Sequence, residues 1–123
     1  MNQHPERAQD YLGHMLQALE RIERYTAGKS ESDFMVDTLI QDGVLRNIAI
    51  LGEAAHRLMT DAPDFVAAHP AIPLAKIYAT RNRLTHAYEH VDLAIVWNLA
   101  LYDAPDLRAK IAAALEAFRD GSA

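Results

Sequence analysis

The sequence predicts an all-α protein, an antiparallel up-and-down bundle of four to five main helices. Half of the 123 residues are hydrophobic, alanine and leucine dominate, and β-branched runs are scarce, which favours helix over strand. Apolar residues recur at three- and four-residue spacing, the period of a helix that is buried on one face. The length suits a single helical domain over residues 1–123, with one core that we place at about residues 5–118.

The N-terminal half predicts two long helical segments separated by a short turn. Residues 5–27 form the first, and Gly28 is a natural stop because glycine readily adopts the left-handed conformation that ends helices. Ser30 or Ser32 is expected to cap a second helical region that continues to about residue 60. The apolar positions that predict the first helix are Leu12, Met15, Leu16, Leu19, Ile22 and Tyr25.

Two glycines lie inside this second region. Gly43 predicts a bend, and Gly52 predicts the close approach of another helix, because glycine has no side chain to hold a neighbour away. The alternative is that both glycines only weaken the helix.

The C-terminal half predicts three further helices after a connector. Residues 61–73 hold three of the five prolines and are expected to form this connector, with one short helical turn. Helices are expected over residues 73–85 and 92–102, each with an apolar face turned inward. Asp103 is expected to cap the last helix, which has Pro105 in its first turn.

Composition and charge exclude several classes of protein. The sequence has no cysteine, so disulfides, thiol catalysis and zinc–thiolate sites are excluded. A net charge of −5 argues against a protein that coats nucleic acid non-specifically, although it leaves room for a local basic cleft. The N-terminus lacks a signal-peptide core and the longest apolar stretch, 91–101, is too short to span a bilayer, so we expect a cytoplasmic protein with no membrane partner. The densest cationic cluster in the sequence comprises Lys76, Arg81, Arg83, His86 and His90.

Residues 81–88, Arg-Asn-Arg-Leu-Thr-His-Ala-Tyr, place a guanidinium, a carboxamide, an imidazole and a phenol within eight positions. Arg81 and His86 are five residues apart, so an ideal helix puts them on different faces. They converge if the helix loosens near Thr85, or if a second copy of the motif faces the first. A guanidinium that is always charged, beside an imidazole that titrates near neutrality, suits phosphate chemistry. The alternative interpretation is a solvated helix end with a C-terminal cation.

Two metal-site interpretations compete with phosphate chemistry. Residues 86–90 fit the H-x-x-E-H pattern of inverted zinc proteases, which also need a third ligand. Glu53-x-x-His56 matches one element of carboxylate-bridged dimetal bundles, which need a second copy and two more glutamates. Glu20 and Glu23 are the candidates for those glutamates. Because short motifs of this kind often mislead, we expect neither a metal nor a cofactor.

The third interpretation is metal-free cleavage of RNA at Arg81 and His86. An RNA 2′-hydroxyl can attack its adjacent phosphate when a base removes its proton and an acid protonates the leaving 5′-oxygen, and His86 suits either role. Arg81 would neutralise charge in the transition state, and Asn82 would orient the phosphate or the histidine. One histidine cannot easily act on both sides of the phosphate, so we expect a homodimer that brings two motifs together.

Other polar and aromatic residues are expected to have structural roles. Trp97 is expected in the core or in a dimer interface. Glu53 is expected to make a structural hydrogen bond rather than to catalyse a reaction. His4, His14 and His69 are expected at the surface.

The residues around the motif follow an order found in a known family. The R-x4-H-x-Y pattern falls on Arg81, His86 and Tyr88, with Asn82 in the usual polar position. On this basis the chain resembles the HEPN superfamily, and within it the HepT-like toxins that are paired with a minimal nucleotidyltransferase antitoxin. The resemblance covers about residues 5–118. The flanking segments that carry it are Leu45-Arg46-Asn47-Ile48, Leu51-Gly52-Glu53-Ala54-Ala55, Val91-Asp92, Val96-Trp97 and Asp106-Leu107.

The resemblance implies a dimeric, metal-independent endoribonuclease that acts on RNA as the toxin of a toxin–antitoxin pair. It implies that Arg81, Asn82 and His86 are catalytic and that Tyr88 is the regulatory residue to which a cognate nucleotidyltransferase attaches AMP. A bulky anion two residues from the histidine would block the cleft by its size and its charge. The alternative from another class is a non-catalytic helical module that binds a nucleotidyltransferase and presents its substrate.

Overall fold

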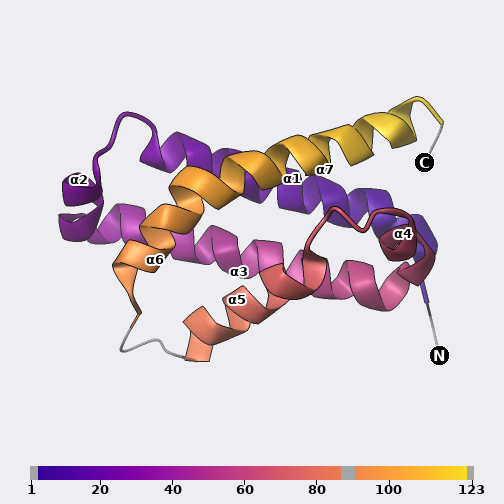
Figure 1. The fold of residues 1–123 in the computed structure, drawn as a ribbon, viewed down its shortest axis with the longest axis horizontal. Helices are drawn as coiled ribbons and strands as arrows, with labels where there is room; N and C mark the ends of the chain where they lie inside the picture. The colour runs from indigo at the N-terminus through magenta and orange to yellow at the C-terminus, as the bar shows by residue number, and fades with distance from the viewer. Residues whose placement is uncertain (1–2, 87–90, 122–123) are drawn as a thin grey trace.

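The computed structural model describes residues 3–86 and 91–121, with the backbone but not the side chains of Thr85 and His86. Within these ranges every regular element is helical, which confirms the all-α prediction (Figure 1). A short 3₁₀ turn (Pro5–Arg7) leads into the first helix. The helices are α1 (Ala8–Thr26), α2 (Glu31–Val36), α3 (Thr38–Asp61), α4 (Pro63–Ala68), α5 (Leu74–His86), α6 (Leu93–Asn98) and α7 (Ala104–Arg119).

The bundle is built from α1, α3, α5 and α7, which run alternately in opposite directions. The helices α1 and α3 lie side by side, α5 packs against α3, and α7 packs against α1. Both ends of the chain therefore lie at the same end of the molecule, where α4 also sits (Figure 1). The short helices α2 and α6 contact each other at the opposite end.

One hydrophobic core lies between these helices. Leu12, Met15, Leu19 and Ile22 form the buried stripe of α1, at the spacing that the sequence predicts. Burial of each such side chain contributes about 1.5–3 kcal/mol, so this core is the main source of stability. None of the described helices is both long enough and apolar enough to cross a lipid bilayer. The largest fully buried side chains are Phe34, Leu12, Met15, Leu19, Ile22, Leu58, Ile111, Val44 and Val96.

The second helical region is divided into α2 and α3, whereas the sequence predicts one continuous helical region. Ser30 begins α2 with a capping box, in which its hydroxyl accepts from the N–H of Asp33 and the Asp33 carboxylate accepts from the N–H of Ser30. Asp37 then leaves the helical conformation, with φ −108° and ψ 96°, and its carboxylate accepts from the N–H of Ile40. This second cap stabilises a new helix start, which the apolar pattern alone does not reveal.

The expectation that Asp103 caps the last helix is wrong. Residues Leu99–Asp103 form a π-helical turn that joins α6 to α7 without a break, and Asp103 itself is helical, with φ −76° and ψ −39°. The first N–H groups of α7 therefore bond to carbonyls of the preceding turn, and no unpaired donors remain for a cap. The helix expected from residue 92 begins at α6, where Asp92 is the cap and accepts hydrogen bonds from the N–H groups of Ala94 and Ile95.

An aromatic contact joins the two short helices at one end of the bundle. Trp97 of α6 is only 5% exposed, and its ring centroid lies 5.3 Å from that of Phe34 in α2. Such aromatic pairs add to the energy of burial. Trp97 is therefore a core residue, one of the two places that the sequence predicts for it.

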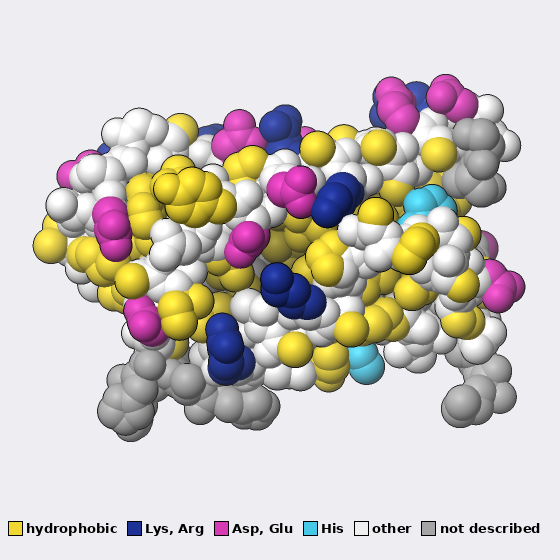
Figure 2. Space-filling view, viewed as in Figure 1, with side chains coloured by type: hydrophobic (Ala, Val, Ile, Leu, Met, Phe, Trp, Pro, Cys, Tyr) yellow, Lys and Arg dark blue, Asp and Glu magenta, His cyan; other side chains and the backbone are white. Residues whose placement is uncertain are grey.

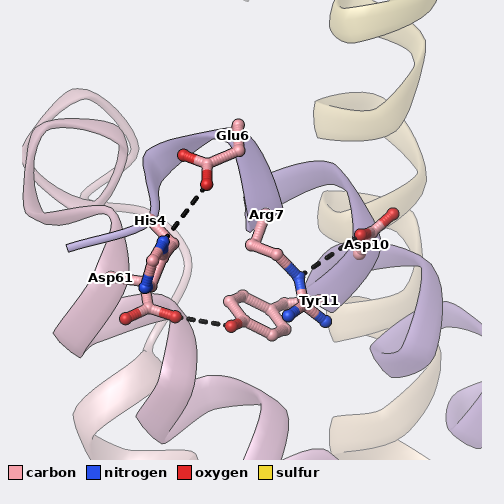
Figure 3. A network of polar contacts seen from close by, with 6 residues as sticks. All are labelled: His4, Glu6, Arg7, Asp10, Tyr11 and Asp61. Atoms are coloured by element: carbon pink, nitrogen blue, oxygen red, sulfur yellow. Dashed lines mark hydrogen bonds and ion pairs between the residues drawn. The ribbon is translucent and has the colours of Figure 1, made fainter. Parts of the chain in front are cut away.

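At the other end, a polar network ties α1 to the end of α3 (Figure 3). Tyr11 of α1 donates a hydrogen bond of 2.5 Å to Oδ2 of Asp61, the last residue of α3. Arg7 lies over the Tyr11 ring, 5.3 Å from its centroid, and pairs with Asp10 at 3.5 Å. The bond to Asp61, together with burial, raises the pKa of Tyr11 above its ordinary value of 10.0.

We expect Tyr11→Phe to lower the free energy of unfolding at neutral pH, because it removes this hydrogen bond. The raised pKa means that the stabilisation is fully present below about pH 10 and is lost as the pH rises through the higher pKa of the folded state. The difference between the two proteins should therefore shrink above pH 10, which urea unfolding at several pH values would measure. A gap that stays constant over this range would contradict the role given to Tyr11.

Candidate functional site

The motif of residues 81–88 occupies the last two turns of α5 and the segment that follows. The helix continues without a break through His86, so it does not loosen before the histidine. The backbone positions of Arg81 and His86 therefore lie about 140° apart around the helix axis. Tyr88, the expected AMP acceptor, lies outside the described residues, as does the side chain of His86.

Arg81 lies against a glycine of the neighbouring helix. A Cβ atom placed on Gly52 of α3 would overlap Cβ and Cγ of Arg81, so no larger residue fits there without movement of α5. The prediction of a close helix approach at Gly52 is confirmed, and its partner is the motif arginine itself. At Gly43 the corresponding contact is the ring of Tyr25, whose nearest carbon would lie 3.0 Å from an added Cβ.

This contact leaves Arg81 half-buried. Its aliphatic stem packs on α3, while Nη1 donates a hydrogen bond of 2.9 Å to Oδ1 of Asn82. Its Nε is buried and has no hydrogen-bond partner among the described residues. An unsatisfied buried donor is rare in folded proteins.

Two adjoining pockets meet at Arg81. The first, of about 480 Å³, lies between α1 and α3, and the second, of about 390 Å³, lies between α3 and the end of α5. Arg46, Ala49 and Arg81 line both pockets, so the two adjoin along these residues, and we refer to them together as the groove. The second pocket includes Leu84 and thus leads toward the end of α5, where His86 lies.

The groove is more basic than the sequence indicates. Besides Arg81, its first pocket is lined by Arg7 of the N-terminal 3₁₀ turn, His14 of α1, and Arg46 and Arg57 of α3. The acidic residues of the two pockets are Glu53 and Asp42, so four guanidinium groups face two carboxylates in a chain of net charge −5. These residues were missed because they lie far from the motif in sequence. The available signal was the spacing of Arg46, Glu53 and Arg57, which follows one helix face.

Lys76 does not join this basic groove, although it is close to Arg81 in sequence. It lines a separate pocket of about 230 Å³ between α3, α5 and α7, together with Lys110, Asp103 and Asp106. In Figure 2 this region appears as a hollow with an apolar floor and charged residues of both signs around it. The mixed charges of its rim do not favour a polyanion.

Glu53 and His56, the residues of the dimetal interpretation, have other partners. Oε1 of Glu53 accepts a hydrogen bond of 3.1 Å from Nε of Arg57, the structural role that the sequence predicts. His56 stacks on Tyr78, with ring centroids 4.5 Å apart. In the described ranges, no three histidine or carboxylate side chains gather closely enough to hold a metal ion. The H-x-x-E-H motif of residues 86–90 falls outside the described side chains.

The remaining histidines lie at or near the surface. His4 and His14 are exposed, as predicted. His69 is instead half-buried, because its ring stacks on Phe65 at 4.0 Å and its Nδ1 lies 2.9 Å from the carbonyl oxygen of the same residue.

Comparison with known proteins identifies the family. The family model for the ribonuclease HepT-like proteins matches residues 15–114 of the chain, a span from the middle of α1 to most of α7. The chain belongs to the HepT-like ribonuclease family. The resemblance that the motif and its flanking segments indicate is thereby confirmed, and the groove around Arg81 is the candidate site of a HepT-like ribonuclease.

Several relatives carry names of the same kind. "Probable ribonuclease HepT" of Thermococcus cleftensis is 36% identical over 82% of this HepT-like chain and 89% of its own length. A protein of Caldanaerobacter subterraneus subsp. tengcongensis that is named as an RNase is 31% identical over 82% of this chain and 88% of its own. A Methanocaldococcus jannaschii protein, named for both a gamma-glutamylcyclotransferase and an RNase, is 36% identical over 86% of this chain. The chain spans about half of that protein, 46% of its length. No solved structure matches the chain significantly.

We expect Gly52→Ala to destabilise this HepT-like protein by about 1–3 kcal/mol, because the added methyl group overlaps the stem of Arg81 and forces α5 away from α3. Gly13→Ala is the matched control. Gly13 also lies inside a helix, but an added Cβ there would meet nothing within 4 Å, so alanine should stabilise by about 0.5–1 kcal/mol. Urea unfolding of both variants measures the contrast, and similar stabilisation by both would contradict close packing at Gly52.

Proposed function

We propose that this chain is a metal-independent endoribonuclease that acts as the toxin of a toxin–antitoxin pair. The observation that carries the proposal is the setting of Arg81, whose side chain lies where two basic pockets meet in a chain of the HepT-like ribonuclease family. Phosphodiester cleavage needs such a cation where negative charge develops.

In the proposed reaction, a 2′-oxygen of RNA attacks the adjacent phosphorus as a base removes its proton. The bond from phosphorus to the 5′-oxygen breaks, an acid protonates that oxygen, and the products are a 2′,3′-cyclic phosphate and a 5′-hydroxyl. Arg81 stabilises the charge on the transition state, and His86 is the acid or the base. Asn82, which already accepts a hydrogen bond from Arg81, fixes the orientation of the guanidinium and the phosphate.

The proposed active form is a homodimer. Because α5 stays helical through His86, the helix itself does not bring Arg81 and His86 to one face. A two-fold axis that pairs the ends of two α5 helices would supply two histidines, one for each side of the phosphate. Sedimentation velocity should then show a dimer, whereas a strict monomer with full ribonuclease activity would contradict this arrangement.

The proposed partner is a minimal nucleotidyltransferase that serves as the antitoxin. The phenol oxygen of Tyr88 attacks the α-phosphorus of ATP, the phenol loses its proton, and pyrophosphate leaves. The AMP group then places a negative charge and a large base beside the catalytic histidine, where it would exclude the phosphates of RNA.

We expect Arg81→Gln and His86→Ala each to reduce RNA cleavage on the order of a hundredfold or more, because each removes a group that acts in the transition state. Glutamine at position 81 keeps the part of the stem that packs on Gly52, whereas alanine would also remove this packing. Arg83→Gln is the matched control, since it removes the same charge from the exposed side of the same helix. The assay is cleavage of defined RNAs with mapped ends, with and without EDTA.

EDTA should have no effect on this reaction. Loss of activity with the chelator, restored by zinc, would instead favour the H-x-x-E-H chemistry of residues 86–90. No cleavage of any RNA, combined with stable binding of the nucleotidyltransferase, would favour the non-catalytic module.

We expect the partner nucleotidyltransferase, with ATP and magnesium, to attach AMP to Tyr88 and to silence the toxin. Tyr88→Phe should escape the modification and remain toxic in the presence of the partner, because the phenol has no part in the proposed cleavage. Intact-mass and peptide mass spectrometry would locate the group. Full neutralisation with Tyr88 unmodified would show that the partner inhibits by occlusion.

A further inference from the structure

The basic groove extends well beyond the motif of α5. Arg46, Glu53 and Arg57 lie seven and four residues apart, so they follow one face of α3. His14 of α1 and Arg7, in the 3₁₀ turn before α1, line the facing side of the same pocket. The proposed cleavage reaction gives none of these residues a role.

The arginines of the groove are only partly neutralised. Arg57 pairs with Glu53 at 3.1 Å, and Arg7 pairs with a neighbouring carboxylate of α1 at 3.5 Å. Among the described residues, neither Arg46 nor Arg81 forms an ion pair with a carboxylate. Arg46 is also exposed, so its guanidinium is free to bind an anion from solution.

The arginines that follow α3 from Arg46 to Arg57 form a row, and its length fits a strand of RNA rather than a single nucleotide. Arg46 and Arg57 are eleven residues apart in α3, which is roughly 16 Å at a rise of about 1.5 Å per residue. Arg81 meets α3 at Gly52, between these two positions. The row is several times longer than the rise of about 3.4 Å per nucleotide along one strand of a duplex, so it can contact more than one phosphate of a strand. A mononucleotide would reach only part of it.

We propose that Arg46, Arg57 and Arg7 bind the backbone phosphates that flank the cleaved bond, so that an RNA strand lies along α3. The inference rests on the proposed ribonuclease function and adds residues that hold its substrate. Guanidinium groups suit this role because their planar fork donates two hydrogen bonds to one phosphate. Contacts of this kind position a strand without reading its bases, so RNAs of different sequence should depend on the row alike.

The test measures binding of a fluorescein-labelled oligoribonucleotide of about a dozen nucleotides by fluorescence anisotropy. The full chain carries His86→Ala throughout, so that bound RNA is not cleaved. Arg46→Gln with Arg57→Gln should weaken binding by about tenfold or more and reduce the slope of log Kd against log salt by about 0.7 for each lost contact. The single variant Arg46→Gln alters only an exposed, unpaired side chain, so it tests the row without risk to the fold.

Lys76→Gln with Lys110→Gln is the matched control. It removes the same charge from the separate pocket, and it breaks one i,i+4 ion pair, Lys110 with Asp106, just as the test variant breaks Arg57 with Glu53. This control should bind RNA within about twofold of the parent, because its lysines lie outside the groove.

Equal loss of RNA binding in the test and control variants would overturn the proposed role of the row. It would leave the proposed ribonuclease function intact, because cleavage of RNA by the chain without substitutions would not be affected. Unchanged RNA binding in the test variant, with loss of nucleotidyltransferase binding, would also overturn it and would assign the row to a protein partner. If the unmodified chain binds RNA through these arginines but cleaves none, the row stands and the ribonuclease proposal fails.

Discussion

The close contact between Gly52 and Arg81 is the constraint on which the rest of the site depends. It lets α5 approach α3 closely enough for the arginine stem to be covered by the neighbouring helix, which leaves the guanidinium few alternative positions. The charged end is then held where two pockets meet, with Nε desolvated and Nη1 bonded to Asn82. A long flexible cation thereby becomes a fixed one, and fixed charges are the ones that stabilise a transition state without reorganisation.

The sequence predicts most of the fold because each helix carries a strong local signal. The stripe of α1, the cap at Ser30, the proline-rich connector and the start of a helix near Asp92 all appear where expected. The two errors, at Asp37 and Asp103, concern whether the local chain continues a helix or ends it at a capping residue. In the first case a new cap outcompetes helix continuation, and in the second the helix continues where a cap was available. The helical spacing of the apolar residues is the same whether a helix continues or a new one starts, so this spacing does not distinguish the two outcomes.

The candidate site is predictable only in part. The motif indicates Arg81 and Asn82 together because they are neighbours in sequence. Gly52 predicts a close contact between helices, but the sequence does not show that Arg81 is the residue in contact. Arg46 and Arg57 become part of the same groove only when α3 lies beside α1 and α5, and this depends on tertiary packing. The turn of the helix explains why Lys76 belongs to another pocket. Lys76 lies five residues before Arg81 in α5, about 140° away around the helix axis, and it lines a pocket with residues of α7.

The π-helical turn at Leu99–Asp103 has a consequence for how this chain is aligned with its relatives. Trp97 is buried there, and on the same side the buried positions 96, 100, 104 and 107 follow one another, so two successive steps of four residues interrupt the usual mixture of three and four. The turn absorbs one residue more than an α-helix would need to connect the same two buried faces. A relative that lacks one residue in this stretch would keep both faces inward with an ordinary helix. A single-residue gap at this point is therefore compatible with an unchanged bundle, whereas a two-residue gap would rotate α7 out of phase with α1.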